Sequence, residues 1–483
     1  MKGGKRYKMR NKYRCICYGI IIALFCFSNN ISYAQENEKQ FIVEFINDIA
    51  LMDTGQNNAR FNILSESELQ ECIDAGIVEW YEEDYEVELL DVECFESEEV
   101  SDSSQNENVK WDLSMINAGR AKELLCEGQD INIGIIDSGI ISHPDLKNNI
   151  KEGFNYLNST TDVTDNIGHG TFVSGMIAAN ENQMGVIGVA DEVSIIPLKC
   201  FESGEKTTVS IICAAIEDAV DVYDCDIINM SLGLTSYSQK LEETIKYATD
   251  RGVIIVAAVG NKGTDVLYYP AAFDNVIGVG SVNSNYEKSD FSQYNISVDF
   301  LAPGEDVWST DNSGAYSTKS GTSFSTPLVT GMIASMLNID NTLTHDEIRA
   351  HIMQTATVRD EWLDENGTYE RNDNYGYGII NISECLNMML QQYTYFISPI
   401  DCEEEQTQVA IVNNSEAVFI GYCMWGEYTE RGMMDMDWEY VNIPPGESVY
   451  ADTNITSNKI KCFLWNSIND ISVISDYRER EAK

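Results

Sequence analysis

Three short segments of the chain carry the residue types that nucleophilic catalysis needs. Asp137 ends an apolar run, His169 stands between two glycines, and Ser323 lies within Ser-Gly-Thr-Ser-Phe-Ser-Thr-Pro at 320–327. A serine hydroxyl is a weak nucleophile until a base takes its proton, and the base needs a third group that fixes its tautomer. An acid, a base and a hydroxyl in these settings predict acyl transfer through a serine nucleophile.

The surroundings of Ser323 favour a nucleophile over a structural role. The apolar run Leu328–Leu337, which follows Pro327, predicts a helix, so the Ser323 hydroxyl is expected at a helix N-terminus. The helix dipole and the free N–H groups there stabilise a developing anion. The alternative is a helix cap, because serine and threonine are favoured at that position. The matching contexts of Asp137 and His169 favour the catalytic interpretation.

His169 is the best candidate for the base among the four histidines of the chain. His143 stands in a Ser-His-Pro-Asp loop, and His345 and His351 belong to a helix with a polar face, where we expect them at the surface. The glycines beside His169 allow another backbone or a substrate to approach closely. An unpaired carboxylate at the end of an apolar strand is costly, so pairing with His169 would explain Asp137.

The chain order of aspartate, histidine and serine, with these local sequences, resembles the subtilisin-like serine proteases. The resemblance covers residues 111–390 and, more weakly, 40–90. It implies a secreted endopeptidase, made as a zymogen, that cuts protein or peptide substrates through an acyl-enzyme. Asp137 would orient His169, which would deprotonate Ser323. An inactive, adhesin-like protein with this fold is a competing hypothesis, although such proteins usually lose a catalytic residue and none is missing here. A protease dedicated to one precursor is a third.

The resemblance also implies two donors for the tetrahedral oxyanion. Ala257–Asn261 follows an apolar strand and matches the family segment whose asparagine side chain supplies one donor, which assigns this role to Asn261. The backbone N–H of Ser323 would be the second donor. The alternative for Asn261 is a turn residue before Lys262 and Gly263.

Substrate contacts are likewise implied by the resemblance. The segment Ser231-Leu232-Gly233 resembles the family strand that pairs with an extended substrate. Tyr268 falls where many relatives have glycine at the floor of the main specificity pocket, so we expect a shallow pocket that favours small or unusual side chains. The expected substrate-binding residues are Ser231, Leu232, Gly233, Val259, Gly260 and Tyr268.

A calcium site is the one cofactor that the resemblance implies, and no organic cofactor is expected. The segment 180–186, Asn-Glu-Asn-Gln-Met-Gly-Val, resembles a calcium loop of the family, and oxygen ligands around a turn suit this ion. The alternative is a surface loop between two elements. The expected ligands are Asp145, Asn180, Asn182, Met184 and Val186, with Glu107 as a further candidate.

Near-continuous Val/Ile runs that alternate with helical stretches predict an α/β unit over residues 109–390. The expected fold is a subtilisin-like three-layer sandwich with a mostly parallel sheet, whose ligands bind at the carboxyl ends of the strands. The expected strands are Ile131–Ile136, Val193–Leu198, Asp226–Met230, Val253–Val259 and Val276–Val282, and the expected helices include Phe172–Ala179, Val209–Tyr223 and Gln239–Asp250.

Residues 35–108 are expected to form a small α+β unit with a linker. A strand at Phe41–Phe45, a helix at Ser67–Gly76 and a strand at Val78–Tyr85 resemble the family's inhibitory propeptide, which would act as an intramolecular inhibitor. That unit ends in a Val-x-x-x-Glu-x-Asp strand, matched here by Val78, Glu82 and Asp84. The polar, acidic stretch Ser101–Asn108 suits an exposed linker, where we expect the processing cut.

Residues 391–483 show short strand-like runs separated by polar turns, which predicts a small β-sandwich as an accessory module. At the other end, residues 1–34 combine seven basic residues, an apolar run at Gly19–Phe27 and the sequence Ser-Tyr-Ala at 32–34. These are the parts of a secretory signal peptide. We therefore expect a secreted protein without stable membrane insertion, with loose cell-surface association left open.

The overall composition argues against two classes of binding function. The formal net charge of −47 over 483 residues argues against nucleic-acid binding and against an anionic membrane surface. The 13 cysteines include no Cys-x-x-Cys pair, and Cys200, Cys213 and Cys225 adjoin apolar runs, where they are expected to be buried. A monomer is expected.

Overall fold

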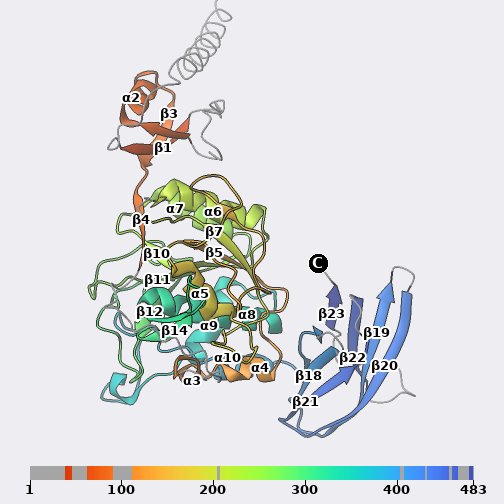
Figure 1. Ribbon diagram of the computed structural model, residues 1–483. Helices are drawn as coiled ribbons and strands as arrows, with labels where there is room; N and C mark the ends of the chain where they lie inside the picture. Colours follow the sequence, from red (N-terminus) through yellow and green to blue (C-terminus); the bar gives the residue numbers. More distant parts are fainter. Residues whose placement is uncertain are drawn as a thin grey trace, which may run out of the picture.

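The computed structural model describes residues 39–45, 62–90, 111–203, 207–402, 407–429, 432–455, 459–465 and 478–481. Three units follow one another along the chain (Figure 1): an N-terminal unit up to Leu90, a central unit from Trp111 to Leu390, and a C-terminal unit from Tyr395 onward. The expected signal peptide at 1–34, the linker at 101–108 and Glu107 lie outside the described residues.

A seven-stranded sheet forms the middle of the central unit, as the sequence predicts. Its order is β13-β12-β11-β9-β5-β7-β6, and its strand pairs are parallel. Since β11, β9 and β5 are neighbours, the loops after them meet at one edge of the sheet. The strands are β5 (Asn132–Asp137), β6 (Phe154–Asn155), β7 (Ser194–Lys199), β9 (Ile227–Met230), β11 (Ile254–Ala258), β12 (Ile277–Val282) and β13 (Phe300–Pro303).

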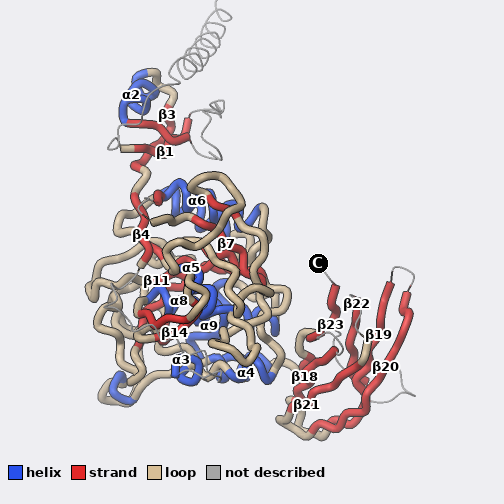
Figure 2. Tube along the Cα trace, in the orientation of Figure 1, coloured by secondary structure: helices blue, strands red, loops and turns tan. Residues whose placement is uncertain are grey.

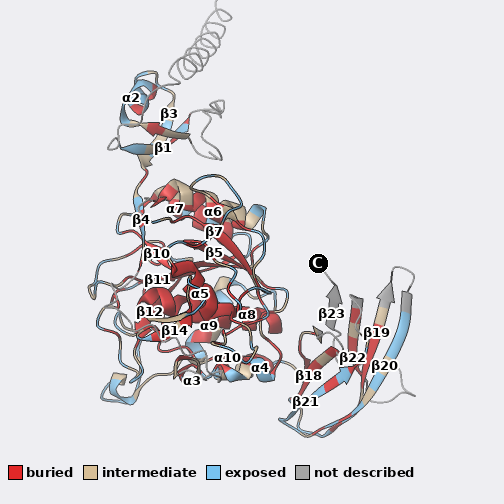
Figure 3. Ribbon diagram, viewed as in Figure 1, coloured by how far each residue is buried: buried red, intermediate tan, exposed pale blue. Residues whose placement is uncertain are grey.

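Helices cover both faces of this sheet (Figures 1 and 2). On one face, α5 (His169–Ala178) and α8 (Thr322–Ile339) pack against each other, and every residue of both is buried (Figure 3). On the other face, α6 (Val209–Asp221) and α7 (Gln239–Thr249) are amphipathic. In α7 the buried residues recur every three or four positions, at Leu241, Thr244, Ile245 and Ala248, so one side faces solvent.

Shorter elements complete the central unit. They are α3 (Trp111–Met115), α4 (Gly119–Glu123), α9 (His345–Thr355), α10 (Ile382–Leu390), a 3-10 helix at Asp360–Trp362, and the strands β8 (Thr207–Thr208), β10 (Leu232–Gly233), β14 (Val307–Thr310) and β15 (Tyr316–Lys319). No helix in the described part of the chain is long and apolar enough to span a membrane.

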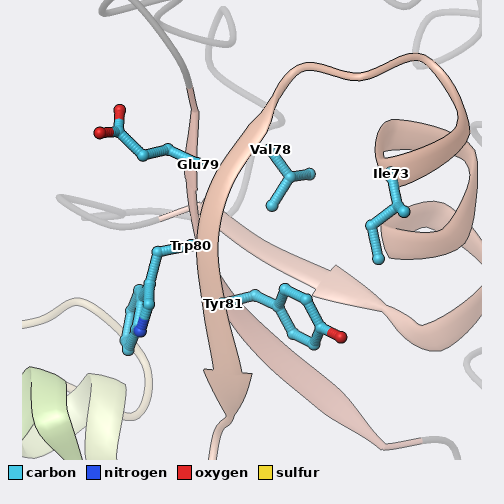
Figure 4. A pocket seen from close by; sticks show the side chains of 5 residues that line it. All are labelled: Ile73, Val78, Glu79, Trp80 and Tyr81. Carbon is cyan, nitrogen blue, oxygen red and sulfur yellow. The ribbon is translucent and has the colours of Figure 1, made fainter.

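The N-terminal unit is a three-stranded antiparallel sheet with one helix. Its elements are β1 (Gln40–Phe45), β2 (Asn62–Ser65), α2 (Glu66–Asp74) and β3 (Val78–Glu83), with strand order β2-β1-β3. One side of the sheet packs with α2 in a small core of its own, whereas Ile42 and Trp80 pack against the core of the central unit. Figure 4 shows Trp80 on the opposite side of β3 from Tyr81 and Ile73.

A further strand, β4 (Glu86–Leu89), runs from the N-terminal unit along the central unit (Figure 1). It lies between β10 and β8 and pairs antiparallel with both. The single strand expected at 78–85 thus ends at Glu83, and the chain then continues as a separate strand on the surface of the central unit.

The C-terminal unit is a sandwich of two antiparallel sheets, as predicted. One sheet holds β16 (Tyr395–Ile397), β17 (Asp401–Cys402), β18 (Thr407–Asn413) and β21 (Ser448–Thr453), and the other holds β19 (Phe419–Thr429), β20 (Gly432–Ile443), β22 (Lys459–Trp465) and β23 (Arg478–Glu481). Apolar side chains from both sheets form a core around the fully buried Trp425. The Tyr450 hydroxyl donates to the Glu123 carbonyl of the central unit at 2.9 Å.

Candidate active site

Asp137 and His169 form a hydrogen-bonded pair at the carboxyl edge of the sheet. Asp137 is the last residue of β5 and His169 is the first residue of α5. The Nδ1 atom of His169 lies 2.8 Å from each carboxylate oxygen of Asp137, and the Ser138 N–H donates to Asp137 Oδ1 at 2.6 Å. An Nδ1–H that donates to a carboxylate selects the neutral tautomer in which Nε2 accepts a proton.

The two glycines beside His169 have separate physical roles. A Cβ at Gly170 would lie 2.2 Å from the Gly139 carbonyl oxygen and 3.1 Å from Asp137 Oδ1, so only glycine lets α5 approach β5 this closely. Gly168 precedes α5 with a φ of 88°, in the left-handed region that favours glycine. The Gly-His-Gly sequence therefore positions the imidazole against the carboxylate.

Ser323 is the second residue of α8, which differs from the predicted helix. The helix begins at Thr322, and Pro327 lies inside it. Because proline has no N–H, the Ser323 carbonyl lacks the hydrogen bond that the residue four positions later would normally donate. The Ser231 hydroxyl, just after β9, donates to this carbonyl at 2.8 Å instead. Pro327 thus frees the Ser323 carbonyl for a hydrogen bond that connects the start of α8 to the edge of the sheet.

His169 lies beside the first turn of α8. Its ring centroid is 5.4 Å from that of Phe324, the residue after Ser323. Asp137, His169 and Ser323 are all 0% exposed. The structure thus brings the predicted acid, base and hydroxyl to one buried place at the end of the sheet.

The side chain of Asn261 is oriented by its neighbour on α8. Asn261 Oδ1 accepts hydrogen bonds from the N–H and the hydroxyl of Thr322, each at 2.8 Å. With its oxygen held in this way, the amide turns Nδ2 toward the Leu90 carbonyl, to which it donates. Asn261 therefore presents an N–H donor next to Ser323, the position that its predicted role requires.

The carbonyl oxygen of Leu90 lies between the candidate nucleophile and this amide. It accepts a hydrogen bond from Ser323 Oγ at 2.6 Å and another from Asn261 Nδ2. The Leu90 N–H donates to the Ser231 carbonyl at 3.3 Å. The Leu90 carbonyl thus contacts both the candidate nucleophile and the candidate oxyanion donor.

The strand before Leu90 is bound as an extended peptide. Leu89 pairs with Leu232, and Glu88 pairs with Gly233, so main-chain pairing between β4 and β10 continues up to the site. Of the six predicted substrate-binding residues, Ser231, Leu232, Gly233, Gly260 and Tyr268 lie around this segment. Val259 does not present its side chain there, because that side chain is fully buried in the main core.

Two carboxylates of the N-terminal unit cap helices of the central unit. Glu82 accepts the Ser238 hydroxyl at 2.6 Å and the N–H groups of Gln239 and Lys240 at 2.9 and 3.1 Å, at the start of α7. Asp84 accepts the N–H and hydroxyl of Ser210, at the start of α6, at 2.8 and 2.6 Å. Negative charge is favourable at helix N-termini, although burial raises the pKa of Asp84.

Comparison with known proteins assigns the family. The model of the subtilase family of peptidases matches residues 128–378, which include Asp137, His169 and Ser323. The chain belongs to the subtilase family. It is therefore a serine endopeptidase with the subtilisin-like α/β fold, as the sequence predicts.

Three relatives illustrate the similarity of this subtilase to known proteins. The M-protease of Shouchella clausii (strain KSM-K16) is 32% identical over 347 residues, 68% of this chain and 90% of the relative. The alkaline protease of Alkalihalobacillus alcalophilus is 32% identical over 374 residues, 74% of this chain and 93% of the relative. Subtilisin Savinase of Lederbergia lenta is 34% identical over 275 residues, 57% and 97% of the two chains.

The loop predicted to hold calcium in this subtilase folds around Asp145. Asp145 Oδ1 accepts from Asn182 Nδ2 at 2.9 Å, and Oδ2 accepts from the Val186 N–H at 3.3 Å and the Tyr316 hydroxyl at 2.7 Å. Asn180 and Met184 belong to the same loop. No group of three or more His, Cys, Asp or Glu side chains among the described residues could hold a metal ion. Both carboxylate oxygens of Asp145 thus accept hydrogen bonds from N–H and O–H groups, so a calcium ion at this carboxylate would have to displace at least one of these donors.

The other histidines take no part in the site. His143 accepts the Asp145 N–H and contacts the Ala315 carbonyl at 2.9 Å, and burial lowers its pKa. His345 and His351, which were expected at the surface, are half-buried, because α9 packs against α10. No local sequence pattern points to Leu90 or to the positioning roles of Thr322 and Ser231, since each depends on a hydrogen bond between distant segments.

Proposed function

We propose that this subtilase is a secreted, self-processing endopeptidase in which Asp137, His169 and Ser323 form the catalytic triad. His169 Nε2 would take the proton of Ser323 Oγ as that oxygen attacks the peptide carbonyl carbon. Asn261 Nδ2 and the Ser323 N–H would hold the oxyanion. His169 would then protonate the leaving amine, and water would release the acyl group from Ser323. The buried Asp137–His169 pair beside α8 supports these roles.

We further propose that residues 35–90 are the inhibitory propeptide and that the first bond cut is Leu90–Asp91. The single observation that carries this proposal is the Leu90 carbonyl, which accepts hydrogen bonds from Ser323 Oγ and Asn261 Nδ2. This position replaces the cut predicted at Ser101–Asn108, a stretch outside the described residues. Pairing of β4 with β10 and the caps from Glu82 and Asp84 would hold the cut propeptide in the cleft.

The remaining assignments complete the proposal. Residues 1–34 would be the signal peptide, 109–390 the catalytic domain and 391–483 an accessory module, in a secreted monomer that binds neither nucleic acid nor membrane. When bound, calcium would supply a positive charge to the loop at 180–186, with ligands from Asp145 and Asn182 and from the carbonyls of Asn180, Met184 and Val186. Its role would be structural, because the loop contains no residue of the triad.

The test is intact mass and N-terminal sequencing of the purified full chain. The wild type should yield a new N-terminus that reads Asp-Val-Glu-Cys-Phe, from Asp91, whereas Ser323→Ala should remain whole at that bond. Ser320→Ala is the matched control, because Ser320 lies in the same segment but its hydroxyl contacts Asp306. It should be cut like the wild type.

Other outcomes identify which part of the proposal fails. A new N-terminus between Ser101 and Asn108 would restore the cut predicted from the sequence. If the wild type and Ser323→Ala were both cut at Asp91, another protease would be the activator. If both remained whole and the wild type hydrolysed no peptide, the adhesin-like hypothesis would replace the active protease.

A further inference from the structure

The side chain of Leu90 packs against Tyr268 and Ala258. Leu90, Ala258 and Tyr268 are 3%, 0% and 4% exposed and form a hydrophobic cluster apart from the main core. The Tyr268 ring spans the space between two glycines. A Cβ at Gly233 would lie 3.0 Å from ring atom Cδ1, and a Cβ at Gly260 would lie 2.8 Å from Cδ2.

The ring of Tyr268 has little freedom to move out of this position. Its two edges contact the backbone at Gly233 and Gly260. Its hydroxyl lies 3.4 Å from Glu88 Oε1 in the bound strand. A side chain larger than leucine would therefore have to displace an aromatic ring that is already in contact on both sides. Overpacking of this kind is unfavourable in close-packed interiors.

We propose that Tyr268 is the specificity-determining residue of this protease and restricts the side chain before the cut bond to branched aliphatic groups of leucine size. This inference rests on the proposed function. Aromatic side chains would not fit beside the ring. Lysine and arginine would find no carboxylate among Ala258, Tyr268, Gly233 and Gly260, and burying an unpaired charge is costly. This substrate class differs from the small or unusual side chains expected from the sequence.

The test compares four fluorogenic peptides with the sequence of residues 85–95 that differ only in the residue at the position of Leu90: leucine, alanine, phenylalanine or lysine. For the mature wild type, kcat/KM should be highest with leucine and about 10- to 100-fold lower with phenylalanine and lysine. Tyr268→Ala should open the pocket and raise the phenylalanine-to-leucine ratio at least about 10-fold. Tyr268→Phe keeps the ring and serves as the matched control, with the wild-type preference.

Several results would overturn this inference. They are equal cleavage of the phenylalanine and leucine peptides by the wild type, an unchanged ratio in Tyr268→Ala, or an altered ratio in Tyr268→Phe. If Tyr268→Ala does not mature, the wild type and Tyr268→Phe still decide the question. Failure of the proposed function is distinguishable, because then no peptide would be cut faster by the wild type than by Ser323→Ala.

A separate observation concerns two cysteines of the C-terminal unit. Cys423 on β19 and Cys462 on β22 are both 0% exposed, and their Sγ atoms are 3.2 Å apart. The strands are adjacent and antiparallel, with Cys423 opposite Leu464 and Cys462 opposite Trp425, so the two cysteines are diagonal neighbours. Both side chains point into the core of the sandwich.

We propose that Cys423 and Cys462 form a disulfide in the exported protein. One thiolate would attack a low-molecular-weight disulfide and release one thiol, and the second thiolate would then attack the mixed disulfide and release the other thiol. Two protein thiols are oxidised and one small disulfide is reduced to two thiols. The hydrogen bond with Cys462, followed by burial, raises the pKa of Cys423 well above its usual value, so the exchange is expected during folding rather than afterwards.

The test is alkylation of the full Ser323→Ala chain, folded with oxidised and reduced glutathione, then denatured without reduction. Peptide mapping should give a linked pair containing Cys423 and Cys462 and alkylated peptides for Cys213 and Cys225. Reduction should separate the pair, and Cys423→Ser should leave Cys462 alkylated. Alkylation of both cysteines in the parent chain, or linkage of either to another cysteine, would overturn the inference.

Discussion

At the scale of single residues, the active site depends on side chains that do not touch the bond to be cut. Thr322 holds Asn261 Oδ1 with two hydrogen bonds at 2.8 Å, and Ser231 holds the Ser323 carbonyl at 2.8 Å. An amide with its oxygen held at two points pays little reorganisation when charge develops on the substrate. Thr322 is thus a positioning residue for the proposed oxyanion donor.

Thr322→Val should lower kcat about 10-fold with little change in KM, because the orientation of Asn261 matters most in the transition state. The shape of the side chain is preserved while one donor to Asn261 is lost. Steady-state kinetics on a leucine peptide measures the effect. Thr322→Ser keeps the hydroxyl and should retain most of the activity. A rise in KM at constant kcat would contradict the positioning role.

At the scale of elements, the junction between the N-terminal and central units uses helix ends. Glu82 accepts three hydrogen bonds at the start of α7, and Asp84 accepts two at the start of α6. These contacts satisfy N–H groups that have no partner within their own helices. The junction is therefore held by directional hydrogen bonds to two carboxylates, in addition to the apolar contact of Trp80.

Glu82→Gln should weaken this junction, because the helix N-terminus interacts more strongly with a carboxylate than with an amide. In the full chain, the time between the first cut and full activity should shorten about 3- to 10-fold. Time courses of peptide hydrolysis measure it. Glu83→Gln is the control, since Glu83 pairs with Lys39 at 2.7 Å within the N-terminal unit. An equal change in both variants would exclude the cap as the cause.

At the scale of the whole molecule, a carboxyl pair lies close to the contact between the central and C-terminal units. Burial, followed by the charge of Asp191, raises the pKa of Glu127 to about 9. The folded protein then keeps this proton where the unfolded chain has released it. The resulting stability is fully present below the ordinary value of 4.5 and is lost as the pH rises through about 9.

The free energy of unfolding should therefore fall between pH 6 and pH 9, by roughly 4 kcal/mol from this group. Glu127→Gln stays neutral and should lose less stability over the same range. Urea unfolding of both chains in the Ser323→Ala background, which prevents self-digestion, makes the comparison. A parallel fall in the two chains would assign the pH dependence to other groups.

Much of the central unit was predictable, because buried parallel strands and glycine-flanked polar residues are local patterns. Asp137 at the end of β5 and His169 at the start of α5 follow from such patterns. The start of α8 at Thr322 does not follow from a local pattern, because proline usually marks a helix boundary. Here Pro327 lies inside the helix, and the Ser323 carbonyl that it leaves without an N–H partner accepts the Ser231 hydroxyl. Leu90 and the Cys423–Cys462 contact depend on long-range pairing, which no local pattern contains.

The strand that carries Leu90 also determines how the timing of activation depends on concentration. If the chain cuts itself at Leu90 as proposed, the cut is a first-order process, and dilution of the protein would not slow it. Removal of the N-terminal unit by other, already active molecules would instead be second order and would accelerate as they accumulate. At low protein concentration, many molecules would then be cut but still blocked by the N-terminal unit. At high concentration, the protein would become active abruptly.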